Sequence, residues 1–201
     1  MIRKVDVEMY RHVEMPSDID KDSLKGPLKN VENNSVFYGQ VRNNMKHGWG
    51  KQIFDNELYY QGHFKNDFPN GWGLQISSTG ECFIGTWKQG DVNGYAEYYN
   101  RSGGYYKGHW KDHKQDGYGE EEVYESNMET KYKGNYTDGK KHGQGSFFWL
   151  SGNDAGNKYE GNFYQNAIHG YGIYTWKDKR QYQGDWQYGK MNGKGVIFLY
   201  I

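Results

Sequence analysis

The sequence has one cysteine, three prolines and no excess of charge of either sign. The single cysteine, Cys82, excludes an intrachain disulfide framework and a cysteine zinc site, and it fits a reducing compartment. No apolar run approaches the roughly 20 residues that span a bilayer, and the first residues lack the apolar core of a signal peptide. Because 25 basic residues balance 25 acidic ones, electrostatics give no reason to expect a nucleic-acid partner. We therefore expect a cytoplasmic protein that binds no nucleic acid.

Branched aliphatic residues are also scarce, whereas aromatic residues and glycine are abundant. Leu, Ile and Val together number 24, against 20 Tyr, 9 Phe and 7 Trp, and 29 residues are Gly. Aromatic side chains must therefore supply most of the buried area. A neutral, polar, aromatic-rich chain of this kind fits a thin or extended fold better than disorder.

Three glycines recur at fixed spacing and define seven units. An opening glycine is followed after nine residues by a second glycine, and after eleven by a third. The opening glycines are Gly39, Gly62, Gly85, Gly108, Gly134, Gly161 and Gly184. Ala96 replaces the third glycine of the third unit, and the other twenty positions are all glycine.

Aromatic residues keep the same register in each unit. A first aromatic stands two residues before the opening glycine and a second aromatic two residues after it, with Val41 as the one exception. This period of two predicts a strand, and turn-forming residues before the second glycine predict a β-hairpin in every unit. We expect the opening glycine to face the third, and the second aromatic to face the second glycine of its own hairpin, as Trp110 would face Gly117.

These residues resemble the MORN repeat (membrane occupation and recognition nexus). The match is clearest in Tyr106-x-Gly108-x-Trp110 followed by Gly117-x-Gly119, and in Tyr182-x-Gly184-x-Trp186 followed by Gly193-x-Gly195. The resemblance covers about residues 36–201. The chain is thereby similar to proteins of cytoskeletal assemblies, including the radial spoke heads of ciliary axonemes. The family name also records an association with phospholipid membranes.

The pattern predicts an all-β fold. Hairpins that cannot bury a face alone stack on their neighbours, which predicts an elongated, single-layer, twisted antiparallel sheet of tandem hairpins, a solenoid-like rod. Residues 36–201 form this seven-unit array. Residues 1–35 are an N-terminal arm in which Val5, Val7, Met9, Val13 and Met15 alternate with polar residues and predict a strand, followed by a short helical turn around Asp18–Leu24. Three interpretations stay open: the arm caps the first hairpin, it binds a partner's sheet, or it is a disordered tail.

Nothing in the sequence predicts catalysis. His47, His142 and His169 share one repeat position that other units fill with Asn or Asp, which indicates a structural turn position. Cys82 has no histidine partner, and Gly-x-Gly lacks the third glycine and the helix of a dinucleotide-binding turn. We read the acidic run around Glu120–Glu129 as a solvated strand edge rather than a metal site. We expect no enzyme activity, no cofactor and no metal.

One row of residues suggests a binding surface. The residue between the second and third glycines should point away from the aromatic–glycine face, and in five units it is aromatic: Trp49, Trp72, Tyr95, Tyr118 and Tyr171. An exposed aromatic row is typical of interface hot spots. The alternative is a groove on the opposite face, where a partner would meet Phe83, Trp87, Tyr106, Trp110, Tyr132 and Tyr136.

We therefore interpret the chain as a non-enzymatic scaffold that binds protein partners in a larger, cytoskeletal and axonemal, assembly. Two alternatives remain. One is a membrane-tethering module for anionic phospholipid, which the balanced charge makes the weaker choice. The other is a regulatory subunit of an enzyme complex, because the repeats this chain resembles accompany catalytic domains in larger proteins. The sequence does not indicate the oligomeric state.

Overall fold

The computed structural model describes residues 15–30, 34–55 and 57–199, which fold into strands and one short 3₁₀ helix. They form two compact units that divide between Gly103 and Gly104. The first unit contains η1 (Lys21–Ser23), β1 (Leu24–Asn30), β2 (Ser35–Arg42), β3 (Met45–Ile53), β4 (Tyr59–Lys65), β5 (Phe68–Ile76), β6 (Cys82–Lys88) and β7 (Asp91–Tyr99). The second contains β8 (Tyr105–Lys111), β9 (Lys114–Glu125), β10 (Met128–Thr137), β11 (Lys140–Trp149), β12 (Lys158–Tyr164), β13 (Ala167–Thr175), β14 (Gln181–Gln187) and β15 (Lys190–Phe198).

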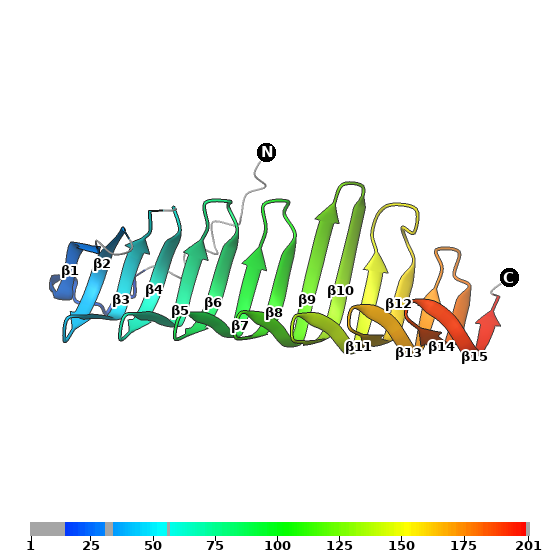
Figure 1. Ribbon diagram of the computed structural model, residues 1–201. Helices are drawn as coiled ribbons and strands as arrows, with labels where there is room; N and C mark the ends of the chain where they lie inside the picture. The colour runs from blue at the N-terminus through cyan, green and yellow to red at the C-terminus, as the bar shows by residue number, and fades with distance from the viewer. Residues whose placement is uncertain (1–14, 31–33, 56, 200–201) are drawn as a thin grey trace. The chain divides into compact units, whose positions relative to one another are not determined.

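Within each unit the strands pair antiparallel with their neighbours in the chain (Figure 1). The pairs β2–β3, β4–β5 and β6–β7 are hairpins 1 to 3, and β8–β9, β10–β11, β12–β13 and β14–β15 are hairpins 4 to 7. The predicted fold class, a single-layer antiparallel sheet of tandem hairpins, is confirmed. The described residues include no helix long and apolar enough to cross a membrane.

The N-terminal segment is described only from Met15 onwards, so the strand predicted from Val5 lies outside the described residues apart from Met15. The predicted helical turn is present as η1, where the Asp20 carboxylate accepts a hydrogen bond of 2.9 Å from the Asp22 backbone N–H. The next residues form β1, which pairs with β2 through Leu28 opposite Phe37. Part of the arm thus lies along the first hairpin.

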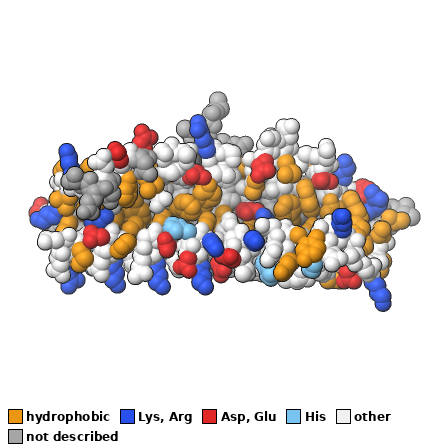
Figure 2. Space-filling model, in the orientation of Figure 1, with side chains coloured by type: hydrophobic (Ala, Val, Ile, Leu, Met, Phe, Trp, Pro, Cys, Tyr) orange, Lys and Arg blue, Asp and Glu red, His pale blue; other side chains and the backbone are white. Residues whose placement is uncertain are grey.

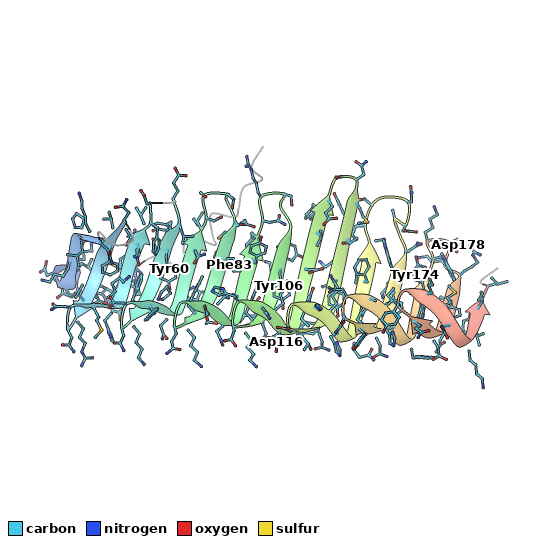
Figure 3. All side chains as sticks on the ribbon, viewed as in Figure 1. Tyr60, Phe83, Tyr106, Asp116, Tyr174 and Asp178 are labelled. Atoms are coloured by element: carbon cyan, nitrogen blue, oxygen red, sulfur yellow. The ribbon has the colours of Figure 1, made fainter. Side chains whose placement is uncertain are left out.

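The opening and third glycines face each other in every hairpin that has both, as predicted. Gly62 lies opposite Gly73 and Gly134 opposite Gly145. A Cβ added at Gly62 would lie 2.5 Å from the Gly73 Cα, and one at Gly145 would lie 2.5 Å from Cε2 of Tyr132. The glycines are required because the ring of the first aromatic lies over the pair. Tyr60, labelled in Figure 3, occupies this position in hairpin 2.

The first and second aromatics build the core as an edge-to-face ring series. In hairpins 2, 4, 5 and 6 the first aromatic contacts the second aromatic of its own hairpin and that of the next hairpin. Tyr60 lies 5.0 Å from Phe64 and 5.4 Å from Trp87, measured between ring centroids, at interplanar angles of 83° and 85°. The same geometry recurs for Tyr132 with Tyr136 and Phe163. Pairs of this type stabilise a fold by about 0.5–1.5 kcal/mol beyond their buried area.

The predicted contact between the second aromatic and the second glycine of its own hairpin is wrong. In all seven hairpins the register shifts between the opening glycine and the second aromatic, so that Trp110 lies opposite Gln115. Gly117 instead faces Tyr136, the second aromatic of the following hairpin. Between the two pairs the second strand of each hairpin advances four residues while the first advances two, so the second aromatic lies two positions further along the partner strand than a regular ladder would place it.

Hairpin 3 departs from the others at the position where Ala96 replaces glycine. Ala96 lies opposite Gly85 and is fully buried, so its methyl group occupies the space that a ring covers elsewhere. The Phe83 ring (labelled in Figure 3) packs instead against Tyr98, 4.7 Å away at 42°, and its centroid is 6.4 Å from Trp87. One methyl group therefore redirects a core ring.

Candidate interaction surface

The row of residues between the second and third glycines lies on the sheet face opposite the aromatic core. We call this row the stripe; its members are Trp49, Trp72, Tyr95, Tyr118, Gln144, Tyr171 and Lys194. Four of its aromatic residues are well exposed, from 36% for Trp72 to 58% for Tyr118. Tyr95 and Tyr171 lie between these values. These four rings can be reached without unfolding the sheet.

Trp49 is the exception, because only 3% of it is exposed. The Gln40 side chain accepts a hydrogen bond from the Trp49 backbone N–H at 2.9 Å and donates one to Ser23 of η1 at 3.1 Å. The Lys51 ammonium group lies 5.5 Å from the centre of the indole ring. The N-terminal turn thus adjoins this end of the stripe, and the accessible part begins at Trp72.

A second row of side chains holds the stripe backbone in place. The residue after each opening glycine lies across from the stripe and bonds to it: Thr86 donates to the Tyr95 carbonyl at 3.0 Å, and Asn162 to the Tyr171 carbonyl at 3.1 Å. His63 takes this position in hairpin 2, with Nδ1 3.2 Å from the Trp72 carbonyl. Its Cβ would be 3.2 Å from a Cβ at Gly71, whose φ is +105°. The second glycine therefore admits this side chain, and His63 has a structural role.

The alternative binding residues lie in the aromatic core. Trp87, Tyr106, Trp110, Tyr132 and Tyr136 are buried, and Phe83 is half-buried. Their rings contact one another edge to face, as Tyr106 contacts Trp110 at 5.0 Å and Tyr136 at 5.1 Å. A partner could reach them only by displacing core contacts, which makes the stripe the accessible row.

Three carboxylates of the acidic cluster, Glu120, Glu121 and Glu122, form ion pairs with lysines. Lys131 forms ion pairs of 2.6 Å with both Glu120 and Glu122, and Lys133 pairs with Glu120 at 2.9 Å. Burial alone would raise the pKa of Glu120, but hydrogen bonds from Lys131 and Lys133 outweigh it and lower the pKa to about 2. No group of three potential metal ligands occurs among the described residues. These carboxylates are components of an ion-pair network across β9 and β10.

Cys82 is buried with Leu74 and Ile84 in a small apolar cluster. Burial raises the pKa of its thiol to about 12, so the nucleophilic thiolate is not formed at neutral pH. His142 and His169 pack against Tyr164, at 5.3 Å and 5.6 Å between ring centres. These side chains stabilise the fold, and none of them forms a nucleophile–base pair.

A hollow lies on the stripe face between hairpins 1 and 2. It is lined by His47, Gly48, His63, Phe64, Lys65, Asn70, Gly71 and Trp72. Glycines lack side chains, so the column of second glycines leaves a depression between neighbouring rows. Sequence analysis did not single out Lys65, although its position, three residues after the opening glycine, repeats in the neighbouring hairpins.

The fold and this surface define a class of protein: a tandem β-hairpin repeat that presents a side-chain row rather than a pocket with catalytic groups. The family profile described as MORN repeat matches residues 37–58, 60–82, 106–122, 132–154, 159–179 and 182–198. The chain therefore belongs to the MORN-repeat family. The profile skips residues 83–105, where Ala96 alters hairpin 3, although β6 and β7 form a hairpin there. None of the curated proteins compared with the chain matches it.

MORN repeats are non-catalytic modules that bind proteins or membrane lipids. That general role, an interaction repeat, applies to this chain through its family membership.

Proposed function

We propose that this protein is a non-enzymatic scaffold that binds a protein partner along the stripe. The observation that carries the proposal is the exposure of Trp72, Tyr95, Tyr118 and Tyr171 on a face that the core does not use. Rigid aromatic side chains contribute large contact areas at low entropic cost, and they dominate interface hot spots. Side-chain hydrogen bonds from Thr86 and Asn162 to the carbonyls of Tyr95 and Tyr171 hold two of these residues in place before a partner arrives.

The proposed setting is a cytoplasmic, cytoskeletal assembly, with a ciliary axoneme as its most specific form. Support comes from the resemblance of the repeat array to axonemal scaffold proteins, among them radial spoke heads. A repeat array suits this role because each hairpin adds a further contact position without changing the others.

Affinity capture with the whole chain as bait tests the proposal. Wild-type protein and the Trp72→Ser/Tyr95→Ser variant are exposed to the same axonemal extract, and captured proteins are quantified by mass spectrometry. An interface anchor is worth about 2 kcal/mol or more, so the variant should retain a partner at least about tenfold less well. Ile53→Ser/Leu150→Ser is the matched control, because both residues are exposed but lie off the stripe.

A parallel sedimentation assay with phosphatidylserine liposomes separates the membrane alternative. If wild-type protein sediments with liposomes and retains no protein partner, the membrane-tethering function replaces the scaffold. If both bait variants retain the same partner equally, binding does not use the stripe.

A further inference from the structure

Hairpins 1 to 3 carry a row of cations beside the stripe. Arg42, Lys65 and Lys88 each stand three residues after an opening glycine, at the end of the first strand and next to the hairpin turn. All three are exposed, and no ion pair links them to another described residue. Figure 2 shows Lys and Arg side chains spaced along the lower edge of the molecule, where the tight turns lie.

The cation row and the stripe face the same side. Lys65 and Trp72 line the same hollow. In the pairing of β5 with β6, Trp72 lies opposite Thr86 and Gly71 lies opposite Trp87. Continued by one residue, this register brings Lys88 of β6 next to Asn70 of β5, a residue that lines the same hollow. Hairpin 3 repeats the arrangement with Lys88 and Tyr95. Hairpins 2 and 3 thus each offer one cation and one exposed aromatic ring, whereas hairpin 1 offers Arg42 beside the buried Trp49.

The distance between equivalent residues of neighbouring hairpins indicates which ligand conformation can contact all of them. Equivalent residues are two strands apart, and neighbouring strands are separated by about 4.8 Å, which gives about 9.6 Å. A polyproline II helix has three residues per turn and rises about 9.3 Å per turn. A β-strand repeats its side-chain direction about every 6.8 Å, and an α-helix has a pitch of about 5.4 Å. Only the polyproline II helix presents the same side chain at the interval of the hairpins.

The chemistry of the two rows matches such a ligand. Exposed Trp and Tyr rings are the surfaces on which proline-rich segments dock. Interior strands of the sheet already pair on both sides, so an added strand cannot bind on this face through its backbone. Three unpaired cations at the same interval call for an acidic side chain at every third residue of the ligand.

We propose that the stripe face of hairpins 1 to 3 binds an acidic, proline-rich segment in the polyproline II conformation. Prolines pack on Trp72 and Tyr95, and carboxylates at every third position pair with Arg42, Lys65 and Lys88. This inference rests on the proposed scaffold function and specifies its partner.

Two observations define where the arrangement occurs and which ligand it suits. Hairpin 4 has the same pair in Lys111 and Tyr118, whereas in hairpins 5 to 7 the cation position holds Thr137, Tyr164 and Gln187. The exposed carboxylate Asp67 lies in the turn after Lys65, and the exposed Asp91 begins β7 opposite Lys88. Alternating charges suit discrete carboxylates at matched spacing better than a uniformly anionic membrane surface.

The test is fluorescence anisotropy with a labelled (Glu-Pro-Pro)5 peptide and the whole chain. We expect saturable binding that weakens at least tenfold in Lys65→Glu/Lys88→Glu and at least tenfold in Trp72→Ser/Tyr95→Ser. Lys190→Glu is the control, because this exposed lysine lies in β15, outside hairpins 1 to 3. The affinity of this variant for the peptide should equal that of the wild type. The peptide (Lys-Pro-Pro)5 should not bind.

A block isomer with five glutamates followed by ten prolines tests the period at constant composition. It should bind at least tenfold more weakly than (Glu-Pro-Pro)5. Equal binding of the two isomers, or no binding of (Glu-Pro-Pro)5, overturns the proposal. A third outcome is also informative. If the wild type binds phosphatidylserine liposomes but not the peptide, and Lys65→Glu/Lys88→Glu loses the liposome binding, the cations bind a membrane instead. If the extract partner still depends on Trp72 and Tyr95 while the peptide fails, only this inference falls and the scaffold function stands.

Discussion

The hydroxyl of Tyr159 donates a hydrogen bond to the backbone carbonyl of Asn162, 3.0 Å away, across the register shift of hairpin 6. The shift leaves Asn162 without a partner in the hairpin ladder, and the first aromatic supplies one. The same bond joins Tyr60 to His63 and Tyr132 to Asn135. Tyrosine therefore serves both as a core ring and as a donor to this carbonyl.

Replacing that hydroxyl tests its contribution. Tyr159→Phe keeps the ring but removes the donor, and it should lower the free energy of unfolding by about 0.5–1.5 kcal/mol. Urea unfolding followed by tryptophan fluorescence measures the change. Tyr118→Phe is the control and should have little effect on stability, because Tyr118 lies on the exposed stripe. Equal losses in the two variants would mean that the bond to Asn162 contributes nothing specific.

The third glycine should tolerate no side chain while a ring covers it. Gly145→Ala would place a methyl group within 2.6 Å of Cζ of Tyr132, and overpacking of this kind costs about 1–3 kcal/mol. In a Tyr132→Ala background the same substitution should cost much less, because the colliding ring is gone. A double-mutant cycle by urea unfolding measures this coupling. Additive losses would contradict the ring-over-glycine contact.

Trp110 should be a major contributor to stability although its predicted contact with Gly117 is wrong. The ring is 8% exposed and meets Tyr106 edge to face. Trp110→Ala should therefore cost about 3–5 kcal/mol, the range for truncating a buried large aromatic residue. Thermal and urea unfolding measure the loss. Tyr118→Ala, on the opposite face of the same hairpin, should cost far less, and a loss below about 1 kcal/mol for Trp110→Ala would show that the ring is not in the core.

The ion-pair network predicts acid sensitivity. The pKa of Glu120 is lowered in the folded state to about 2, so its ionised form stabilises the fold above the unfolded pKa of about 4.3. This stabilisation should disappear as the pH falls from about 5 towards 2. Glu120→Gln should therefore lower stability at pH 7 and have little effect at pH 2, measured by urea unfolding across that range. Glu125→Gln, an exposed neighbour at the end of β9, is the control.

Cys82 should react only when the protein opens. The thiol is buried and its pKa is raised to about 12, so both access and thiolate formation are suppressed. Labelling with Ellman's reagent should be slow in buffer and complete in urea. Its urea dependence should follow unfolding of hairpins 2 and 3. Rapid labelling of the native protein would show that β6 opens locally.

The sequence was sufficient for the hairpins and for the pairing of opening and third glycines, because both follow from spacing alone. Spacing could not reveal the register shift, since the two extra residues in the second strand occur in every repeat and leave the period unchanged. It also could not reveal the displaced Phe83 ring, which results from the volume of one methyl group at Ala96. Spacing also does not distinguish the buried Trp49 from the other stripe aromatics, because Gln40 links its backbone to Ser23 of η1, a segment outside the repeat.

Tyrosine at the first aromatic position was a signal that sequence analysis did not use. Five of the seven units have Tyr there and two have Phe, and the five tyrosines are those that donate to a carbonyl. The cation row was also visible as Arg42, Lys65 and Lys88 at one repeat position. Its meaning required the register, which places these residues beside the stripe.

The ring series has a consequence for how such a protein changes its length. The ring of Tyr132 contacts Tyr136 of its own hairpin and Phe163 of the next, and Tyr159 contacts Phe163 and Trp186 in the same way. The interfaces between hairpins 5 and 6 and between hairpins 6 and 7 thus have the same ring contacts. Gene duplication or deletion of one whole hairpin would bring matching surfaces together again. The length of the repeat array can therefore evolve in steps of one hairpin, while the remaining interfaces keep their packing.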